Sequence, residues 1–325
     1  MAIVFMFPGQ NSRYPGMLAK FSALHPENGL LVEEASDILG RNLQRHFRAD
    51  NEHAFTRNRD VQVGVFLASH MLLCSLQRAG VETAWSLGLS LGEYNHLVHI
   101  GALRLEDALP LLEARGDAYD ETPHGVMASV FPIALDALQK AMAAASLPGV
   151  CCIALHNSPR QHVVSGEQDS IHRLVEELEE DFVEHAFIEE RLAMHSSLMA
   201  PAAQSFRCAL EKTDWMTPRS AYFPNVTAQL AWAPSREDFI NLLTRHIQEP
   251  VLWRESLELI AATAPEPSLL EVGPKGVLSA MAGRRWLTCP VLKTDVEEDF
   301  QAHFEGLVEE LKFGQRESAV AHSQR

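Results

Sequence analysis

Hydrophobic and polar residues alternate along this chain in blocks whose spacing switches between that of strands and that of helices. A continuous apolar run at residues 3–7 predicts a buried first strand, and the stretch 61–79 has the periodicity of a long buried helix. A second apolar run at 84–87 predicts another strand, and helical patterns follow at 93–100 and 105–118. Strands and helices that alternate in this way favour an α/β fold over an all-α or all-β one.

Residues 125–192 have an element order of their own, which predicts a small subdomain. Patterns of strand, helix, strand, strand, helix and strand follow one another, which is the order of the ferredoxin-like unit. The second of these helices is expected at 170–180, with Ser170 as its N-cap. We therefore expect a large domain made of residues 1–124 and 193–313, with the ferredoxin-like subdomain inserted between its two parts.

The second part of the large domain continues the same mixture of elements. Its patterns predict helices at 201–212, 239–247 and 253–262 and strands at 221–226 and 268–272. The last residues, 314–325, are mostly polar and are expected to form a disordered tail.

Charge and cysteine content narrow the classes of protein to which the chain can belong. A net charge of −16 argues against nucleic acid as a partner, because a phosphate backbone needs a basic surface. No apolar run approaches the roughly 20 residues of a membrane helix, and the N-terminus lacks the basic region of a signal peptide. Five cysteines without a Cys-x-x-Cys spacing argue against a disulfide framework and a metal site, and favour a reducing cytoplasm.

The segment Gly88-Leu89-Ser90-Leu91-Gly92 lies between a predicted strand and a predicted helix. A Gly-x-Ser-x-Gly in that position is typical of a nucleophile elbow, where the serine side chain projects from a sharp turn. The two glycines allow the backbone to turn without clashes of Cβ atoms. The free N–H groups at the start of the following helix would face an oxyanion formed at Ser90.

Ser90 would need a base, and His195 is the best candidate among the 15 histidines. His96 and His99 lie on the helix that follows Ser90, which points away from the serine side chain, so we interpret them as partly exposed helix residues. His195 lies where the chain leaves the small subdomain and re-enters the large domain. Clefts between domains are common ligand sites, so His195 is placed to face one.

Seven short motifs, taken in order, resemble the malonyl-CoA:acyl-carrier-protein acyltransferase family, including the stand-alone acyltransferases of polyketide synthases. The resemblance runs from about residue 3 to about residue 310, and it implies an α/β-hydrolase-like large domain with a ferredoxin-like small subdomain. The motifs are Phe7-Pro8-Gly9-Gln10, Gly88-Leu89-Ser90-Leu91-Gly92-Glu93-Tyr94, Arg115-Gly116, Asn157-Ser158-Pro159, His195-Ser196, Asn225-Val226-Thr227 and Glu271-Val272-Gly273-Pro274.

The resemblance implies a role for each matching residue. Ser90 would take the acyl group from a CoA thioester, and His195, oriented by a backbone carbonyl rather than an aspartate, would act as base and then acid. The backbone N–H groups of Gln10 and Leu91 would form the oxyanion hole. Arg115 would hold the malonyl carboxylate through a bidentate pair, unless it is a surface residue paired with neighbouring carboxylates.

Some positions depart from the family pattern close to the reactive pair. Leu89 replaces the usual histidine before the serine, and Met194 replaces a common phenylalanine or serine before His195. We expect both, together with Asn157, to contact the substrate and bear on which acyl group fits. His246 stands where the family has a glutamine, and that change is expected to be harmless because the backbone carbonyl of this residue is the group used.

The resemblance thus implies an acyltransferase that moves a malonyl or related group from CoA to the phosphopantetheine thiol of an acyl carrier protein, with no bound cofactor and no metal. The chain is expected to be a monomer and, since it begins at its first strand, to act on a separate carrier protein. That acidic partner would dock on a few cations, Lys275, Arg284 and Arg285. Two alternatives stay open, an editing hydrolase of acyl carrier proteins with the same Ser–His site and a binding protein with a dead site.

Overall fold

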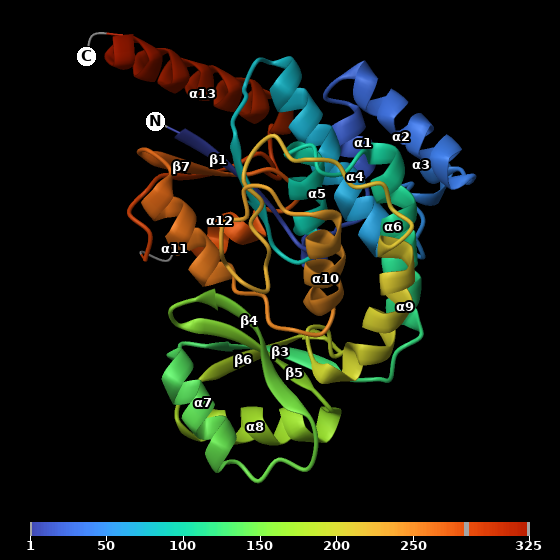
Figure 1. Cartoon of the computed structure of the whole chain (residues 1–325), viewed down its shortest axis with the longest axis vertical. Coiled ribbons are helices and arrows are strands. Elements are labelled where there is room, and N and C mark those ends of the chain that lie inside the picture. Colours follow the sequence, from blue (N-terminus) through green and yellow to red (C-terminus); the bar gives the residue numbers. More distant parts are fainter. Residues whose placement is uncertain (1, 283–285, 324–325) are drawn as a thin grey trace.

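Two separate β-sheets organise the molecule, and the chain passes from one to the other and back (Figure 1). The structure is a computed structural model that describes residues 2–282 and 286–323. The first sheet has four parallel strands in the order β2-β1-β7-β8. They are β1 (Ala2–Phe7), β2 (Trp85–Gly88), β7 (Pro267–Glu271) and β8 (Val291–Lys293).

Helices cover both faces of this parallel sheet, which explains the unbroken apolar run of β1. Figure 1 shows α4, α5 and α6 to the right of the sheet and α11 and α12 below it. The helices are α1 (Met17–Ser22), α2 (Pro26–Leu39), α3 (Leu43–His46), α4 (Asn58–Arg78), α5 (Gly92–His99), α6 (Leu105–Asp120), α9 (Ala200–Leu210), α10 (Arg236–His246), α11 (Trp253–Thr263), α12 (Val277–Ala282) and α13 (Phe300–Ser323), with short 3-10 turns η1 (Gln10–Ser12) and η2 (Ser197–Met199).

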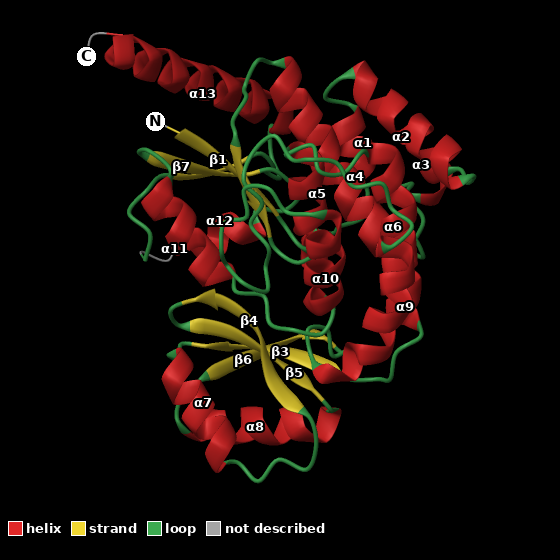
Figure 2. Cartoon of the chain, in the orientation of Figure 1, coloured by secondary structure: helices red, strands yellow, loops and turns green. Residues whose placement is uncertain are grey.

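The second sheet is antiparallel, and helices cover one of its faces (Figure 2). Its order, β4-β5-β3-β6, places the first and third strands of the unit in the centre, which is the ferredoxin-like arrangement. The fold class predicted from the sequence is therefore confirmed. The elements are β3 (Val126–Phe131), α7 (Leu135–Ala144), β4 (Cys151–Ser158), β5 (Gln161–Gly166), α8 (Gln168–Glu180) and β6 (Glu184–Glu189).

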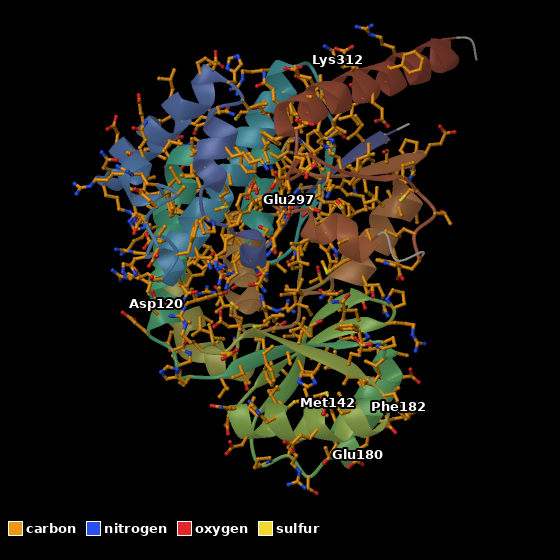
Figure 3. The ribbon with its side chains drawn as sticks, turned by 180° about the vertical axis from the view of Figure 1, so that it is seen from behind. Asp120, Met142, Glu180, Phe182, Glu297 and Lys312 are labelled. Atoms are coloured by element: carbon orange, nitrogen blue, oxygen red, sulfur yellow. The ribbon has the colours of Figure 1, made fainter. Side chains whose placement is uncertain are left out.

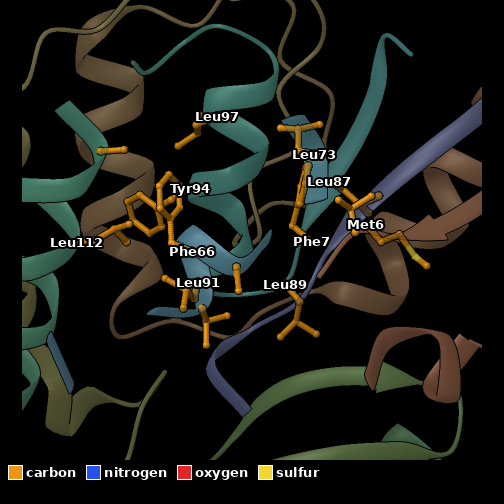
Figure 4. Packing of buried hydrophobic residues seen from close by; sticks show 14 of the residues in the cluster. Met6, Phe7, Phe66, Leu73, Leu87, Leu89, Leu91, Tyr94, Leu97 and Leu112 are labelled. Carbon is orange, nitrogen blue, oxygen red and sulfur yellow. The ribbon is translucent and has the colours of Figure 1, made fainter. Parts of the chain in front are cut away.

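Backbone hydrogen bonds attach the small sheet to the large domain along strand β4. The Val251 N–H donates to the carbonyl of Ala154 at 2.8 Å, and the His156 N–H donates to the carbonyl of Val251 at 3.0 Å. Each domain also has its own apolar cluster. Figure 4 shows the larger cluster, in which Leu89 lies at the end nearest the small subdomain. The nucleophile turn therefore lies at the junction of the two domains.

The predicted disordered tail is wrong for the described residues after 314, because α13 continues to Ser323. Its first half buries Phe304, Leu307, Val308 and Leu311, which are spaced as one face of a helix. That buried face fixes the first turns, and the polar residues that follow continue the helix beyond the body of the molecule (Figure 3, where Lys312 marks it). No helix in the described ranges is both long and apolar enough to cross a bilayer.

Two smaller predictions are also wrong. Residues 221–226 do not form a strand of either sheet; Tyr222 makes only an isolated bridge with Ala231. Helix α8 begins at Gln168 with Glu167 as its N-cap, so Ser170 lies inside the helix. The Ser170 hydroxyl instead accepts a hydrogen bond from the Gly149 N–H at 2.9 Å.

Candidate active site

Ser90 lies on the sharp turn between β2 and α5, with its backbone in the left-handed region at φ 51°. The glycines on either side are required sterically, because a Cβ on Gly92 would lie 2.0 Å from the carbonyl oxygen of Phe7. The Asn225 side chain holds the turn from the other side. Its Oδ1 accepts a hydrogen bond from the Ser90 N–H at 2.7 Å, and its Nδ2 donates to the carbonyl of Gly88 at 2.7 Å.

His195 faces Ser90 from the segment that returns from the small subdomain. Its Nε2 lies 2.9 Å from the Ser90 Oγ, and its Nδ1 lies 2.8 Å from the backbone carbonyl oxygen of His246. Since a carbonyl can only accept, the Nδ1 carries the proton and the Nε2 is free to accept one from Ser90. Burial, with the charge of Arg115 as a smaller cause, lowers the pKa of His195 to about 3, so the ring is neutral near pH 7.

The N–H groups of Gln10 and Leu91 flank Ser90, one from the loop after β1 and one from the turn itself. Gln10 opens the turn η1, and Leu91 is the N-cap of α5. Within the described part of the chain, neither N–H donates to a protein acceptor. Free N–H groups at the start of α5 attract negative charge, which fits the oxyanion hole expected at this position.

Arg115 is fully buried on α6, which excludes the alternative of a surface residue. Its guanidinium lies over the rings of Tyr119 and Tyr94, with centroids 4.7 and 5.4 Å away. The Nη1 donates to Gln62, whose amide donates in turn to the Gln10 side chain at 3.1 Å. The Nε and Nη2 are buried and have no hydrogen-bond partner among the described residues.

A cavity of about 430 Å³ opens beside Ser90 and His195 between the two domains. Leu89, Met194 and Asn157, three of the four residues predicted to contact substrate, line it, and so does Lys275. The fourth, Arg115, is fully buried and is not among the lining residues. Most of its wall is apolar, with a few amide and hydroxyl groups. The apolar side chains are those of Leu89, Met127, Leu155, Val163, Ile188, Met194, Val277, Leu278, Ala280 and Met281. Arg284 and Arg285 lie outside the described residues.

His96 and His99 are not partly exposed, as the sequence interpretation had them; both are buried. The Ser86 hydroxyl lies 2.7 Å from the Nδ1 of His96 and 2.8 Å from the Nδ1 of His99. The Nε2 of His96 accepts from the backbone N–H of Phe223. These hydrogen bonds replace those that the imidazole rings would make to water, which is why the rings can be buried in this core. They join the two rings to Ser86 and Phe223 and not to Ser90.

The sequence reasoning missed Gln62, which links Arg115 to Gln10. A signal was available, because Gln62 is a polar residue inside the apolar periodic stretch of α4. It also left the Asn225 side chain without a defined position, since no local pattern shows which distant backbone groups a buried amide will contact. In the described ranges, no group of three or more His, Cys, Asp or Glu side chains is arranged to hold a metal ion.

Known proteins are similar to this chain over most of its length. Residues 4–316 match the profile of the acyl transferase domain family. The chain is 32% identical over 286 residues to the malonyl CoA-acyl carrier protein transacylase of Escherichia coli (strain K12), a match that covers 86% of this chain and 91% of the relative.

Solved structures superpose over nearly the whole chain. The crystal structure of the malonyl CoA-acyl carrier protein transacylase from Clostridium perfringens has a TM-score of 0.89 and 25% identity, and the match covers 98% of this chain and 100% of that one. A complex of a type II polyketide synthase acyl carrier protein with its malonyl-transacylase has a TM-score of 0.87 and 26% identity, covering 95% of this chain and 100% of that one.

Proposed function

The chain belongs to the acyl transferase domain family, and on that premise we propose that it moves a malonyl group from CoA to the phosphopantetheine thiol of an acyl carrier protein. The family indicated by the sequence motifs is thus confirmed. One observation carries the mechanism: the Ser90 Oγ lies 2.9 Å from the Nε2 of a neutral His195 whose Nδ1 proton is fixed by a carbonyl. The transfer then takes place in two half-reactions, and both use the Ser90 hydroxyl and the His195 ring.

In the first half, the Ser90 Oγ attacks the thioester carbonyl of malonyl-CoA while its proton passes to the Nε2 of His195. The negative oxygen of the tetrahedral intermediate is stabilised by the N–H groups of Gln10 and Leu91. The C–S bond then breaks, and His195 returns the proton to the leaving CoA thiolate. The products are free CoA and a malonyl ester on Ser90.

In the second half, the carrier thiol gives its proton to the Nε2 of His195 and attacks the Ser90 ester. The same two N–H groups stabilise the second oxyanion. The C–O bond to Ser90 then breaks, and the Ser90 oxygen takes the proton back from His195. Ser90 is restored, and the malonyl group leaves on the carrier. The ring is neutral before each proton transfer, because burial lowers the pKa of His195.

Arg115 is our candidate for selecting a carboxylated acyl group. Its unpartnered Nε and Nη2 form one edge of a planar guanidinium, which can bind a carboxylate through two parallel hydrogen bonds. Gln62 and the Tyr119 ring hold the plane in place. Gln62 also donates to the Gln10 side chain at 3.1 Å, which supports a link between the proposed clamp and the loop that carries the proposed oxyanion-hole donor.

The apolar cavity favours a second candidate, an editing hydrolase that removes unfunctionalised acyl chains from a carrier protein. Leu89, Met127 and Met194 would suit an alkyl chain better than a carboxylate. The chemistry differs in one step, since water would replace the carrier thiol in the second half. The buried Arg115 favours the transferase, because a hydrolase of such chains has no carboxylate to bind.

We make three further proposals, on the partner, the assembly state and the compartment of the protein. We propose that the chain works as a monomer in the cytoplasm and that Lys275, at the cavity, contacts the acidic carrier. The left-handed backbone of Lys275 is held by its N–H, which donates to Asp295 at 2.7 Å.

Partition of the acyl group between thiol and water tests the proposal. The protein is incubated with malonyl-CoA and a holo acyl carrier protein, and separately with a butyryl-carrier protein. We expect fast formation of malonyl-carrier protein and slow release of free acid. Rapid release of butyrate without detectable malonyl transfer would establish the hydrolase instead.

A further inference from the structure

A buried carboxylate, that of Glu93 on α5, lies between the two residues that hold the reactive pair. The Glu93 side chain is 1% exposed, and three groups face its oxygens. The Tyr222 hydroxyl donates to Oε1. The Asn225 backbone N–H donates to Oε2 at 3.3 Å, and the Nδ1 of His246 lies 3.4 Å from the same oxygen.

Asn225 and His246 are the residues on which Ser90 and His195 depend for their positions. The Asn225 side chain bonds the Ser90 N–H, and the His246 carbonyl accepts from the His195 Nδ1. The Oε2 of Glu93 thus faces both segments, which come from different parts of the chain. A single carboxylate oxygen joins the support of the nucleophile to the support of the base.

We propose that Glu93 and His246 form a positioning pair for the Ser90–His195 dyad, in which the ionised Glu93 carboxylate fixes the Asn225 and His246 segments together. The inference rests on the proposed function, because it assigns the pair to the acyl transfer at Ser90. Glu93 touches neither reacting atom; it acts through Asn225 and His246. Dyads need this support, since displacement of a reacting group by about 1 Å can cost on the order of 100-fold in rate.

The hydrogen-bonding capacity of the cluster favours the ionised carboxylate as the holding form. The Asn225 N–H can only donate toward it, the Tyr222 hydroxyl donates to Oε1, and a neutral His246 can place its one proton on Nδ1. An ionised Glu93 accepts from Tyr222 and Asn225 and attracts the proton on the Nδ1 of His246, which lies 3.4 Å away without making a normal hydrogen bond. A protonated Glu93 must place its own hydrogen on one of these oxygens, and on Oε2 that hydrogen competes with Asn225 and His246.

The His246 ring is suited to carry this effect to the base. Its centroid lies 5.2 Å from that of His195, with the planes 31° apart. Both of its ring nitrogens are buried and make no normal hydrogen bond within the described ranges, so the approach to Glu93 is its main polar contact. The ring belongs to the residue whose carbonyl orients His195, so a contact that holds the ring also restrains that residue.

The arrangement gives the dyad a dependence on pH that His195 itself does not supply. Burial raises the pKa of Glu93 to about 8, while the Tyr222 hydroxyl, the Asn225 N–H and Arg115 oppose that rise. Tyr94 is the other titratable group that interacts electrostatically with Glu93. The fraction of molecules in which Ser90 and His195 are correctly positioned should therefore rise as pH rises through about 8. This is far above the pKa of His195, which is about 3.

The test is the pH profile of Ser90 acylation by malonyl-CoA, measured as kcat/KM between about pH 6 and about pH 10. For the wild-type protein we expect a rising limb centred near the Glu93 pKa of about 8. Glu93→Gln should lose the limb, with a rate at least about tenfold below wild type at the alkaline end and within about twofold at the acid end.

Two further variants separate positioning from simple packing. Tyr222→Phe removes a hydrogen bond that stabilises the charged carboxylate, so the limb should move to higher pH rather than disappear. His246→Gln should keep the limb because its amide N–H can donate to Oε2, whereas His246→Leu should lose it. Asn95→Ala is the matched control, since Asn95 is buried on the same helix and bonds the Phe66 carbonyl instead of the dyad's supports.

The outcomes are distinct. A wild-type protein that forms no Ser90 ester contradicts the proposed function, whatever the variants do. A wild-type protein that acylates while Glu93→Gln retains the rising limb overturns the positioning pair alone. If Glu93→Gln does not fold, Tyr222→Phe decides: a limb displaced upward supports the pair, and an unmoved limb overturns it.

Discussion

The backbone carbonyl of His246 accepts a hydrogen bond from the Nδ1 of His195 at 2.8 Å, at the ring nitrogen that does not face Ser90. This contact performs the orienting task that a carboxylate performs in a Ser-His-Asp triad, because it fixes the tautomer and the plane of the ring. It adds no negative charge. The ring therefore relies on its surroundings when it becomes an imidazolium.

Removal of His195 should slow both halves of the transfer. We expect His195→Ala to lower the rate of Ser90 acylation by about 100-fold to 10,000-fold, since general base catalysis contributes that range. Single-turnover mixing with malonyl-CoA followed by rapid acid quench measures the rate directly. A loss of less than about tenfold would remove His195 from the role of base.

Arg115 should discriminate between malonyl and acetyl groups. Arg115→Met keeps most of the side-chain volume between Tyr94 and Tyr119 but removes the charge. A charge-assisted hydrogen bond contributes about 1.5–3 kcal/mol, so kcat/KM for malonyl-CoA should fall at least about tenfold while that for acetyl-CoA is unchanged or higher. Equal losses for both donors would make Arg115 a structural residue.

The turn at the nucleophile should not tolerate a side chain at its second glycine. A Cβ on Gly92 would approach the Phe7 carbonyl oxygen to 2.0 Å, and neither backbone can move without disturbing the parallel pair of β1 and β2. We expect Gly92→Ala to lower the free energy of unfolding by about 3 kcal/mol or more. Urea denaturation measures this, and Gly29→Ala, where the new Cβ would meet nothing within 4 Å, is the matched control.

Buried histidines should make the protein sensitive to acid. Burial lowers the pKa of His70 to about 4 and that of His96 to about 3, whereas the same residues have a pKa of 6.5 in the unfolded chain. Below pH 6.5 the unfolded state therefore binds more protons, and the free energy of unfolding falls as pH drops toward 4.

His96→Gln should reduce this slope, because each unit of pKa separation corresponds to about 1.4 kcal/mol. The measurement is urea denaturation at several pH values above and below 6.5. An unchanged free energy of unfolding across that interval would show that these rings are not held neutral by burial.

Much of the fold could be predicted because local patterns and tertiary burial agree there. The run 3–7 is apolar on both faces because β1 lies inside a parallel sheet covered by helices. The order of elements in 125–192 specified a ferredoxin-like sheet, since few arrangements can bury such a unit. Ser90 was recognisable because its flanking glycines are dictated by contacts only a few residues away.

The rest depends on contacts that no local pattern records. The helix α13 extends through a polar stretch because an earlier apolar face anchors it. His96 and His99 are buried because Ser86, on the neighbouring strand, supplies their hydrogen bonds. The Glu93 cluster joins α5 to residues at least 129 positions further along the chain, so its geometry appears only in the folded chain.

The central claim is that Ser90 carries the acyl group, and the mass of the protein after mixing with malonyl-CoA tests it most directly. Wild-type protein, quenched in acid and digested, should show one malonyl adduct, on the peptide that contains Ser90. Ser90→Ala should show none, and a holo acyl carrier protein added before the quench should remove the adduct from the wild type as malonyl-carrier protein accumulates. An adduct that persists in Ser90→Ala, or an ester that the carrier thiol cannot discharge, would contradict the account.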